Sequence, residues 1–392
     1  MRVLKSGSLW LALLLALAGC STAPKPGPEQ PAPPNWGAVP PRVLTTPSAP
    51  GKPVSKPSQK PAPSPAPTFA PAPTNQLNTV WIPLDRWSQL NGLGPPRRFS
   101  VETQVSYTIG TPRGTLTLRS KSHIAHWNGM ELQLGFAPEE ANGHLLVNSL
   151  DAQKTFSTLL EPFSLPEKDH RVIVIDPGHG GSNTGTKSVL GNHFEKEYTL
   201  DWAKRLKPLL EAGGWTVFLT HTNDVDMSLS NRVAFAEAHH ADFFVSLHFN
   251  APPRPDPEPN GVMTFCLTPA GMPSSLTRDP DDEISQVFPN NSFDGQNLQY
   301  ALRLHRAILA VNGGADRGIC HARFIGVLRR QNRPAILIEG GFLSNPREAR
   351  HIADPAYRQK LAEAIAGALT DTNPTTAFTL APDSLRPTAS KP

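Results

Sequence analysis

The segment Arg171–Gly181, RVIVIDPGHGG, constrains the fold of this 392-residue chain more than any other stretch. Its apolar run Val172–Ile175 has no polar break, which is typical of a strand buried on both faces of a parallel sheet. The run stops at the turn DPG, residues 176–178, because proline offers no N–H to a ladder and glycine permits a sharp turn. His179 therefore follows the carboxyl end of a predicted central strand. Open α/β sheets bind their ligands at that edge.

Strand and helix patterns alternate from this segment to Leu369. Strands are predicted at Val172–Ile175, Thr216–Leu219, Phe243–Leu247, Gly261–Leu267, Phe324–Leu328 and Ala335–Ile338, and helices at Tyr198–Ala212, Asn231–His240, Gln299–Val311 and Ala356–Leu369. This order predicts a three-layer α/β/α domain over residues 170–370, with a mostly parallel sheet covered on both faces. The segment 269–295, rich in Pro, Asn and acids, interrupts the pattern. We expect it to be either a functional lid or a disordered loop.

Three of the predicted strands end next to residues that can bind a metal ion. The first is followed by His179, the third ends at His248, and the last ends at Glu339 before two glycines. Since carboxyl ends of parallel strands meet at one edge of a sheet, these side chains are expected to lie together. A catalytic zinc site with a separate general base needs one more carboxylate. The first helix opens with Glu195 and Glu197, and we favour Glu195 because Glu197 starts the solvated face.

Each of these residues also has an ordinary structural interpretation. His179 alone could be a loop histidine, His248 a satisfied core histidine, and Glu339 a cap or a partner of Arg323 or Arg330. The coincidence at three strand ends favours the metal site over these separate explanations.

Other catalytic signatures are missing from the sequence or incomplete. HExxH, the helix-borne motif of metalloproteases, is absent, and so is the GxSxG elbow of α/β-hydrolases. His193-Phe194-Glu195 imitates the HxE of zinc deaminases, but no CxxC follows it. His305 lies on a predicted helix and is expected to be exposed.

The first 20 residues have the pattern of a secreted lipoprotein. A basic start and the apolar stretch Leu9–Ala18 are typical of a signal peptide over residues 1–19, and the stretch is too short to span a bilayer. The sequence LAGC, ending at Cys20, resembles the lipobox of bacterial lipoproteins. This resemblance implies lipidation of Cys20 and, with Ser21 beside it, sorting to the outer membrane. An ordinary signal peptide followed by an incidental cysteine is the alternative.

Residues 20–75 are predicted to form a disordered tether after the lipidated cysteine. Eighteen of the 43 prolines lie between Ser21 and Asn75, and large apolar residues are nearly absent, so no core can form there. Residues 1–75 hold seven Lys or Arg and one acid, so the net charge of +4 leaves about −2 for the remainder. The folded part therefore shows no basic footprint for nucleic acid. The polar tail 371–392 is also expected to be disordered.

Residues 76–163 show the period-two alternation of half-buried strands. The alternation is clear over 101–109, 116–118 and 130–134, and 152–160 fits one short helix. We predict a small β-rich domain of about four to six strands. Its sequence resembles the N-terminal domain of copper amine oxidases, which also occurs as a wall-associated stalk in secreted hydrolases. That resemblance implies a spacer or wall-contacting role.

Four stretches of residues 171–369 resemble, in order and spacing, the zinc-dependent N-acetylmuramoyl-L-alanine amidases that cut bacterial peptidoglycan. They are DPGHGG, FEKEYTLDWAKRL, SLSNRVAFAEAHHADFFVSLHFNA and RFIGVLRRQNRPAILIEGGFLSNP. Carried over by position, the resemblance implies that His179, Glu195 and His248 bind Zn²⁺. It also implies that Glu339 is the catalytic glutamate, which takes the proton of the attacking water.

The same resemblance implies hydrolysis of the amide between N-acetylmuramic acid and L-alanine, in wall remodelling or daughter-cell separation. Within it, Asp176 would orient a ligand and Asn250 would contact substrate. Arg232 also fits the family's pattern, but we expect it to form a structural pair on its helix. Two features depart from the family. Gly340 stands where many members have Thr, Ser or Cys, and segment 252–297 does not match the long regulatory helix of some members. Autoinhibition by such a helix is therefore not expected.

Together these features predict a monomeric peptidoglycan amidase on the periplasmic face of the outer membrane, anchored through Cys20, with any protein activator left open. Two rival hypotheses remain. One is a glycosidase that uses Glu195 and Glu339 as an acid–base pair. The other is a peptidoglycan-binding or activator protein without catalysis. Cys266 and Cys320 either form a disulfide, which an oxidising compartment allows, or stay as buried thiols.

Overall fold

The structure, a computed structural model, describes residues 80–101, 104–167, 171–251, 258–277 and 282–370. All of these residues belong to the compact unit Pro73–Pro392. The predicted signal peptide, Cys20, the tether and the tail 371–392 lie outside the described residues. Among the described helices, none combines the length and the apolar character that crossing a membrane requires.

The part of the chain before residue 164 is β-rich, as predicted. It contains α1 (Leu84–Leu90), the π-helical turn η1 (Asp151–Phe156), α2 (Ser157–Leu160) and the strands β1 (Trp81–Pro83), β2 (Arg97–Val101), β3 (Gln104–Thr111), β4 (Gly114–Arg119), β5 (Ile124–Trp127), β6 (Met130–Gln133), β7 (Glu139–Ala141) and β8 (His144–Asn148). Strands β2 to β6 form an antiparallel meander, and β1, β8 and β7 form a separate small sheet. The prediction of four to six strands is too low, because β1 and β7 are only three residues long and show no readable alternation.

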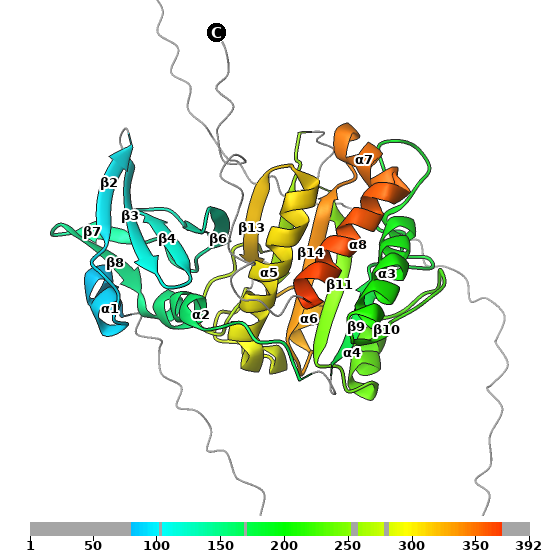
Figure 1. Cartoon of the computed structure of the whole chain (residues 1–392), viewed down its shortest axis with the longest axis horizontal. Helices are drawn as coiled ribbons and strands as arrows, with labels where there is room; N and C mark the ends of the chain where they lie inside the picture. The colour runs from blue at the N-terminus through cyan, green and yellow to red at the C-terminus, as the bar shows by residue number, and fades with distance from the viewer. Residues whose placement is uncertain (1–79, 102–103, 168–170, 252–257, 278–281, 371–392) are drawn as a thin grey trace, which may run out of the picture. The chain divides into compact units, whose positions relative to one another are not determined.

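The second part carries a twisted sheet flanked by helices (Figure 1). Its strands are β9 (Val172–Pro177), β10 (Thr216–Leu219), β11 (Phe243–Asn250), β12 (Val262–Cys266), β13 (Asp316–His321) and β14 (Ala335–Phe342). Its helices are α3 (Glu195–Ala212), α4 (Leu229–Ala238), α5 (Asp294–Asn312), α6 (Gly326–Arg329), α7 (Pro346–Ala353) and α8 (Pro355–Thr370). The strand order is β10-β9-β11-β14-β12-β13, and β13 pairs with β6, so the meander continues the same eleven-stranded sheet.

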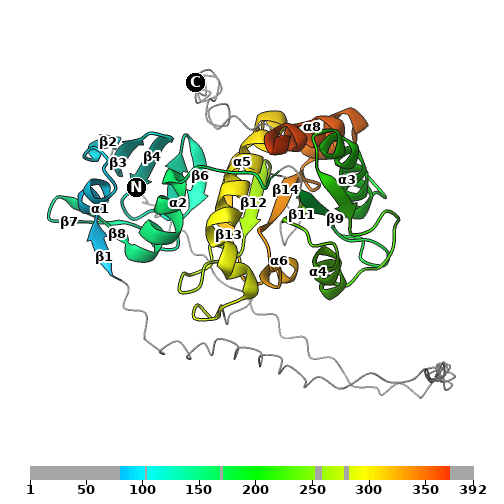
Figure 2. The ribbon, with the colours of Figure 1, turned by 60° about the horizontal axis from the view of Figure 1, so that its bottom comes forward.

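Helices cover both faces of this sheet, which confirms the three-layer α/β/α architecture. Along β9, Ile173 packs in a core with Trp202 of α3 and Leu361 of α8, whereas Val174 packs on the opposite side with Ala236 of α4. Figure 2 shows α3 and α8 on one side of the strands and α4 and α6 on the other. The unbroken apolar run of β9 follows from this, because both of its faces are buried.

The predicted strand Phe324–Leu328 is wrong. Residues Gly326–Arg329 form the short helix α6, and the strand of this region is β13, Asp316–His321. Strand β13 contains polar residues and Gly318, which has φ +78°, so it has no apolar run that would predict a strand. The strand exists because it pairs with β12 on one side and with β6 on the other.

The described parts of the segment 269–295 lie at the opposite edge of the sheet from the predicted metal site. Strand β12 runs antiparallel to β14, so its last residue, Cys266, lies toward the amino end of β14. The described parts of the segment are held by the buried Arg323, which donates to Asp282 at 2.8 Å and to the carbonyl of Pro269 at 3.1 Å. A lid over the metal site is therefore excluded for the described parts of this segment.

Cys266 and Cys320 are both buried free thiols. In the ladder between β12 and β13, the partner of Cys320 is Phe265. Cys266 belongs to the core on one face of the sheet and Cys320 to the core on the other. The two side chains therefore face away from each other, and of the two alternatives the disulfide is ruled out.

Candidate metal centre

Three elements bring the predicted metal ligands together at the carboxyl edge of the sheet. His179 lies in the turn after β9, Glu195 is the first residue of α3, and His248 lies near the end of β11. Strands β9 and β11 are parallel neighbours, so both end at this edge. The strand-end argument from the sequence predicts this placement for the two histidines, and the sequence indicates Glu195 separately, as a carboxylate at the start of the first helix.

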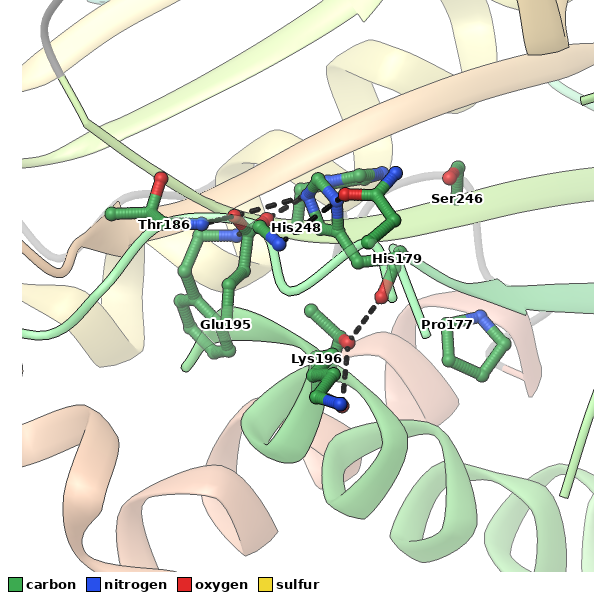
Figure 3. A network of polar contacts seen from close by, with 12 residues as sticks. Pro177, His179, Thr186, Glu195, Lys196, Ser246 and His248 are labelled. Atoms are coloured by element: carbon green, nitrogen blue, oxygen red, sulfur yellow. Dashed lines mark hydrogen bonds and ion pairs between the residues drawn. The ribbon is translucent and has the colours of Figure 1, made fainter. Parts of the chain in front are cut away.

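The Glu195 carboxylate contacts both imidazole rings, one through each of its oxygens (Figure 3). Its Oε2 is 3.0 Å from Nε2 of His179, and its Oε1 is 2.9 Å from Nδ1 of His248. The two rings meet edge to face with centroids 4.8 Å apart. One ligand atom from each of the three side chains lies within 4.8 Å of the others.

Two backbone N–H groups also donate hydrogen bonds to the Glu195 carboxylate. Its Oε2 accepts the N–H of Thr186 at 2.9 Å, and its Oε1 accepts the N–H of Phe249 at 3.1 Å. Glu197 instead is exposed and accepts the N–H of Phe194 at 3.2 Å, as the capping residue of α3. The structure thus places Glu195 in the site and Glu197 outside it.

The electrostatics of the three residues are coupled. Burial would raise the pKa of Glu195, but the hydrogen bonds from His179 and His248 outweigh it and hold that pKa well below its usual range. Burial lowers the pKa of His179, yet the hydrogen bond and the charge of Glu195 outweigh burial and raise it. The carboxylate is therefore ionised, as a metal ligand must be.

The donor set fits Zn²⁺. Zinc prefers imidazole nitrogen and carboxylate oxygen, and catalytic sites use three protein ligands so that a fourth position stays open. Two imidazoles and one ionised carboxylate meet that description, and both imidazole side chains remain partly accessible. The residues that would hold zinc are thus His179, Glu195 and His248.

A buried ion pair fixes the turn that carries His179. Asp176 and Arg232 are in contact at 2.6 Å, and Asp176 also accepts from Thr220 and Ser246. Arg232 in turn donates to the backbone carbonyls of Pro177 and His179. His179 has φ +67°, a region that non-glycine residues rarely adopt, so these bonds hold a strained backbone.

Asp176 therefore acts on the backbone of the turn through Arg232. Arg232 does form a structural pair, but its partner is Asp176 of β9 and not a residue of its own helix α4. The side chain that contacts the His179 ring is Asn183, whose Oδ1 is 2.9 Å from Nδ1. Sequence reasoning missed Asn183, although its place four residues after His179 in a glycine-rich turn was a usable signal. Such an outer partner fixes which ring nitrogen faces the metal.

Glu339 lies on the strand next to His248, one of the three predicted ligands. Strands β11 and β14 are parallel, and His248 and Glu339 are direct register partners. Side chains at paired positions of adjacent strands project to the same face. Glu339 is half-buried. Asn250, predicted to contact substrate, is half-buried at the end of β11, where it pairs with Phe342.

Comparison with known proteins shows the family of the chain. The sequence pattern of the N-acetylmuramoyl-L-alanine amidase family matches residues 173–371, half of the chain. The chain belongs to this family. It is 33% identical over 214 residues to N-acetylmuramoyl-L-alanine amidase AmiC of Neisseria meningitidis, covering 50% of this chain and 51% of that protein. It is 31% identical over 234 residues to AmiA of Escherichia coli K12, covering 54% of this chain and 80% of that protein.

Among solved structures, N-acetylmuramoyl-L-alanine amidase from Clostridium difficile 630 is similar. It is 32% identical, with a TM-score of 0.42 over 51% of this chain and 94% of that chain. The matched region of the present chain spans about half the length of the Neisseria relative. Residues before 173 lie outside the family match.

Proposed function

We propose that the chain is a zinc-dependent hydrolase that cleaves the amide between N-acetylmuramic acid and L-alanine in peptidoglycan. The observation that carries the proposal is the convergence of His179, Glu195 and His248 with Glu339 on the neighbouring strand. This convergence occurs inside an N-acetylmuramoyl-L-alanine amidase domain. It provides a metal-ligand set together with a separate carboxylate, as hydrolysis requires.

A bound zinc and the Glu339 carboxylate would supply different parts of the chemistry. A bound zinc supplies Lewis-acid chemistry that lowers the pKa of water and stabilises negative charge on oxygen. Glu339 accepts the proton of the attacking water and passes it to the departing amine of L-alanine. Asp176 and Arg232 keep the His179 turn in place while this occurs. Asn250 contacts the substrate from the end of β11.

The proposed setting is the periplasmic face of the outer membrane, where the enzyme acts as a monomer anchored through a lipidated Cys20. A lipidated amino-terminal cysteine typically carries three acyl chains, which is more than the two signals that stable attachment needs. The proline-rich tether of residues 20–75 would allow a reach of up to about 170 Å in polyproline II form. That reach would let an anchored enzyme meet a peptidoglycan layer away from its membrane. The β-rich region serves as the spacer or wall-contacting part.

The test is digestion of purified muropeptides followed by mass analysis of the products. The zinc-loaded protein should release stem peptides with a free L-alanine amine and create no new reducing sugar. Glu339→Ala and a chelated sample should release none, whereas Glu197→Ala, the exposed neighbour of Glu195, should remain active. Cleavage that survives both chelation and Glu339→Ala would sink the proposal. New reducing ends would instead support a glycosidase, and binding without products a non-catalytic wall protein.

A further inference from the structure

Strand β14 is irregular immediately after Glu339. His248 pairs with Glu339, and the next pair is Asn250 with Phe342. Gly340 and Gly341 thus stand opposite the single residue Phe249, which makes a β-bulge. Bulges re-aim side chains and are common beside active sites. The direction of the Glu339 carboxylate therefore depends on how this bulge is held.

Helix α7 places a carboxylate next to the bulge. Asn345 caps this helix by accepting the N–H groups of Arg347 and Glu348, and Pro346 occupies its first turn. Glu348 consequently lies in the first turn of α7 and reaches back toward the end of β14. Its side chain is almost fully buried, with a residue exposure of 5%.

The Glu348 carboxylate joins three segments at the catalytic edge of the sheet. Its Oε2 accepts the N–H of Phe342, the residue that closes the bulge, at 2.8 Å. Its Oε1 accepts the N–H of Gly261, just before β12, at 2.9 Å and Nδ2 of Asn312, at the end of α5, at 3.0 Å. Strand β12 is the other neighbour of β14, and its Met263 pairs with Glu339.

Asn312 holds the bulge from its other end. Its Nδ2 lies 3.3 Å from the carbonyl oxygen of Gly340, the residue that directly follows Glu339. Asn312 is itself buried, and its Oδ1 accepts the N–H of Gly314 at 2.8 Å. Glu348 and Asn312 thus form hydrogen bonds with Phe342 and Gly340, the two residues that flank Gly341. The φ of Gly341 is +148°, which marks the turn of the bulge.

Burial of the Glu348 charge costs free energy that its hydrogen bonds from Phe342, Gly261 and Asn312 must offset. The same three bonds hold the end of β14 in one geometry. We propose that Glu348, together with Asn312, is a positioning residue for catalysis: it locks the β-bulge of β14 and so sets the direction of the Glu339 carboxylate beside His248. This inference rests on the proposed function, in which Glu339 is the proton acceptor.

The test is E348Q in the full-length zinc-loaded protein. The amide keeps the shape but offers one acceptor in place of two, so it cannot serve Phe342, Gly261 and Asn312 together. We expect kcat on muropeptides to fall ~10- to 100-fold, as for other displacements of a catalytic group. KM and the zinc content should stay unchanged, and the acid limb of the pH–rate profile should shift, because the environment of Glu339 has changed.

A matched control is Asp242→Asn, which makes the same change in a carboxylate at the amino edge of the sheet. Asp242 accepts the N–H of Val172 at 2.7 Å, far along the strands from Glu339. This variant should keep the kcat and the pH profile of the wild type. If E348Q fails to fold, Asn312→Ala provides the second test, with a smaller kcat loss of the same kind.

The outcomes separate the two claims. A wild type that yields no amidase product would overturn the proposed function itself. An active wild type with E348Q of equal kcat would overturn the positioning role. So would an E348Q whose kcat loss follows its fraction of unfolded protein with an unchanged pH profile, as a purely structural residue would give. A kcat loss with a shifted pH profile and full zinc content would support the inference.

Discussion

The imidazole of His248 lies against the α-carbon of Gly178. A β-carbon on Gly178 would stand 2.3 Å from Cε1 of His248 and 2.5 Å from its Nε2. Only glycine therefore leaves room for the ring, which must remain within reach of Glu195. The glycine of the DPGHGG turn is a requirement of the metal site in addition to a requirement of the turn.

We expect Gly178→Ala to displace the His248 ring and weaken zinc binding. Outer changes near metal sites typically cost about 10- to 100-fold in affinity, and direct displacement of a ligand should cost at least that much. Competition with a chromophoric chelator measures the effect. Gly110→Ala in β3 is the control, because a β-carbon there meets nothing within 4 Å. Unchanged zinc affinity in Gly178→Ala would show that the ring is free to move aside.

The pair of Asp176 and Arg232 predicts a large loss of stability on truncation. Both side chains are buried, with residue exposures of 1% and 4%. Arg232→Met would leave the buried Asp176 carboxylate without its charged partner, which costs about 3–5 kcal/mol. Urea unfolding monitored by circular dichroism measures this value.

Glu211→Gln provides the comparison for that measurement. Its partner Lys207 lies 2.6 Å away in a solvent-exposed pair on α3, for which about 0.5 kcal/mol or less is expected. An Arg232→Met protein that loses less than about 1 kcal/mol would contradict the assignment of Arg232 as the anchor of the His179 turn.

The sequence predicts the central strands because their burial on both faces is written locally as apolar runs. The sequence does not predict features that depend on partners far away along the chain. The sequence predicts an exposed His305, but this side chain is completely buried, where Thr264 contacts its Nδ1 at 3.0 Å and Asp316 contacts its Nε2 at 2.9 Å. Both partners come from strands that no pattern in the helix reveals. Strand β13 is missed for the same reason.

The candidate site also contains residues that the sequence predicts and others that it does not. The rule that parallel strands end at one edge is sufficient to bring His179, His248 and Glu339 together. It cannot find Glu348 as a buried partner of β14, because that contact depends on how α7 packs. A local signal does exist, since Asn345 and Pro346 are typical of a helix start and place Glu348 in its first turn.

His321 predicts a dependence of stability on pH. Burial lowers the pKa of this β13 histidine to about 4, although a hydrogen bond with the backbone of Gln133 in β6 opposes the shift. In the unfolded chain the same pKa is about 6.5. Above pH 6.5 both states are neutral. Between pH 6.5 and 4 only the unfolded state gains the proton, so the free energy of unfolding falls by about 3 kcal/mol over that range.

Comparison with His321→Gln isolates this effect from the other titrating groups. The difference in free energy of unfolding between the two proteins should be constant from pH 8 to 7. It should then shift in favour of the variant as the pH falls to 4.5. Urea titrations at fixed zinc concentration give both curves. Parallel curves over the whole range would mean that His321 is reached by solvent when protonated.

Gly340 predicts a coupling with Trp202 of α3. The family resemblance places a larger residue at position 340 in many members, but here a β-carbon would lie 2.9 Å from Cη2 of Trp202 and 3.2 Å from Cε1 of Phe249. The indole, which is completely buried, occupies the space that a side chain at 340 would need. Gly340→Ala should therefore overpack the core and cost about 1–3 kcal/mol.

A double-mutant cycle tests whether the indole is the cause. Trp202→Phe removes the ring atoms nearest to Gly340, so Gly340→Ala should cost at least about 1 kcal/mol less in that background than in the wild type. Urea unfolding of the four proteins gives the coupling energy. Equal costs in both backgrounds would place the strain in the backbone of the bulge instead. The coupled result would show that the glycine and the tryptophan must change together for a bulkier residue to stand next to Glu339.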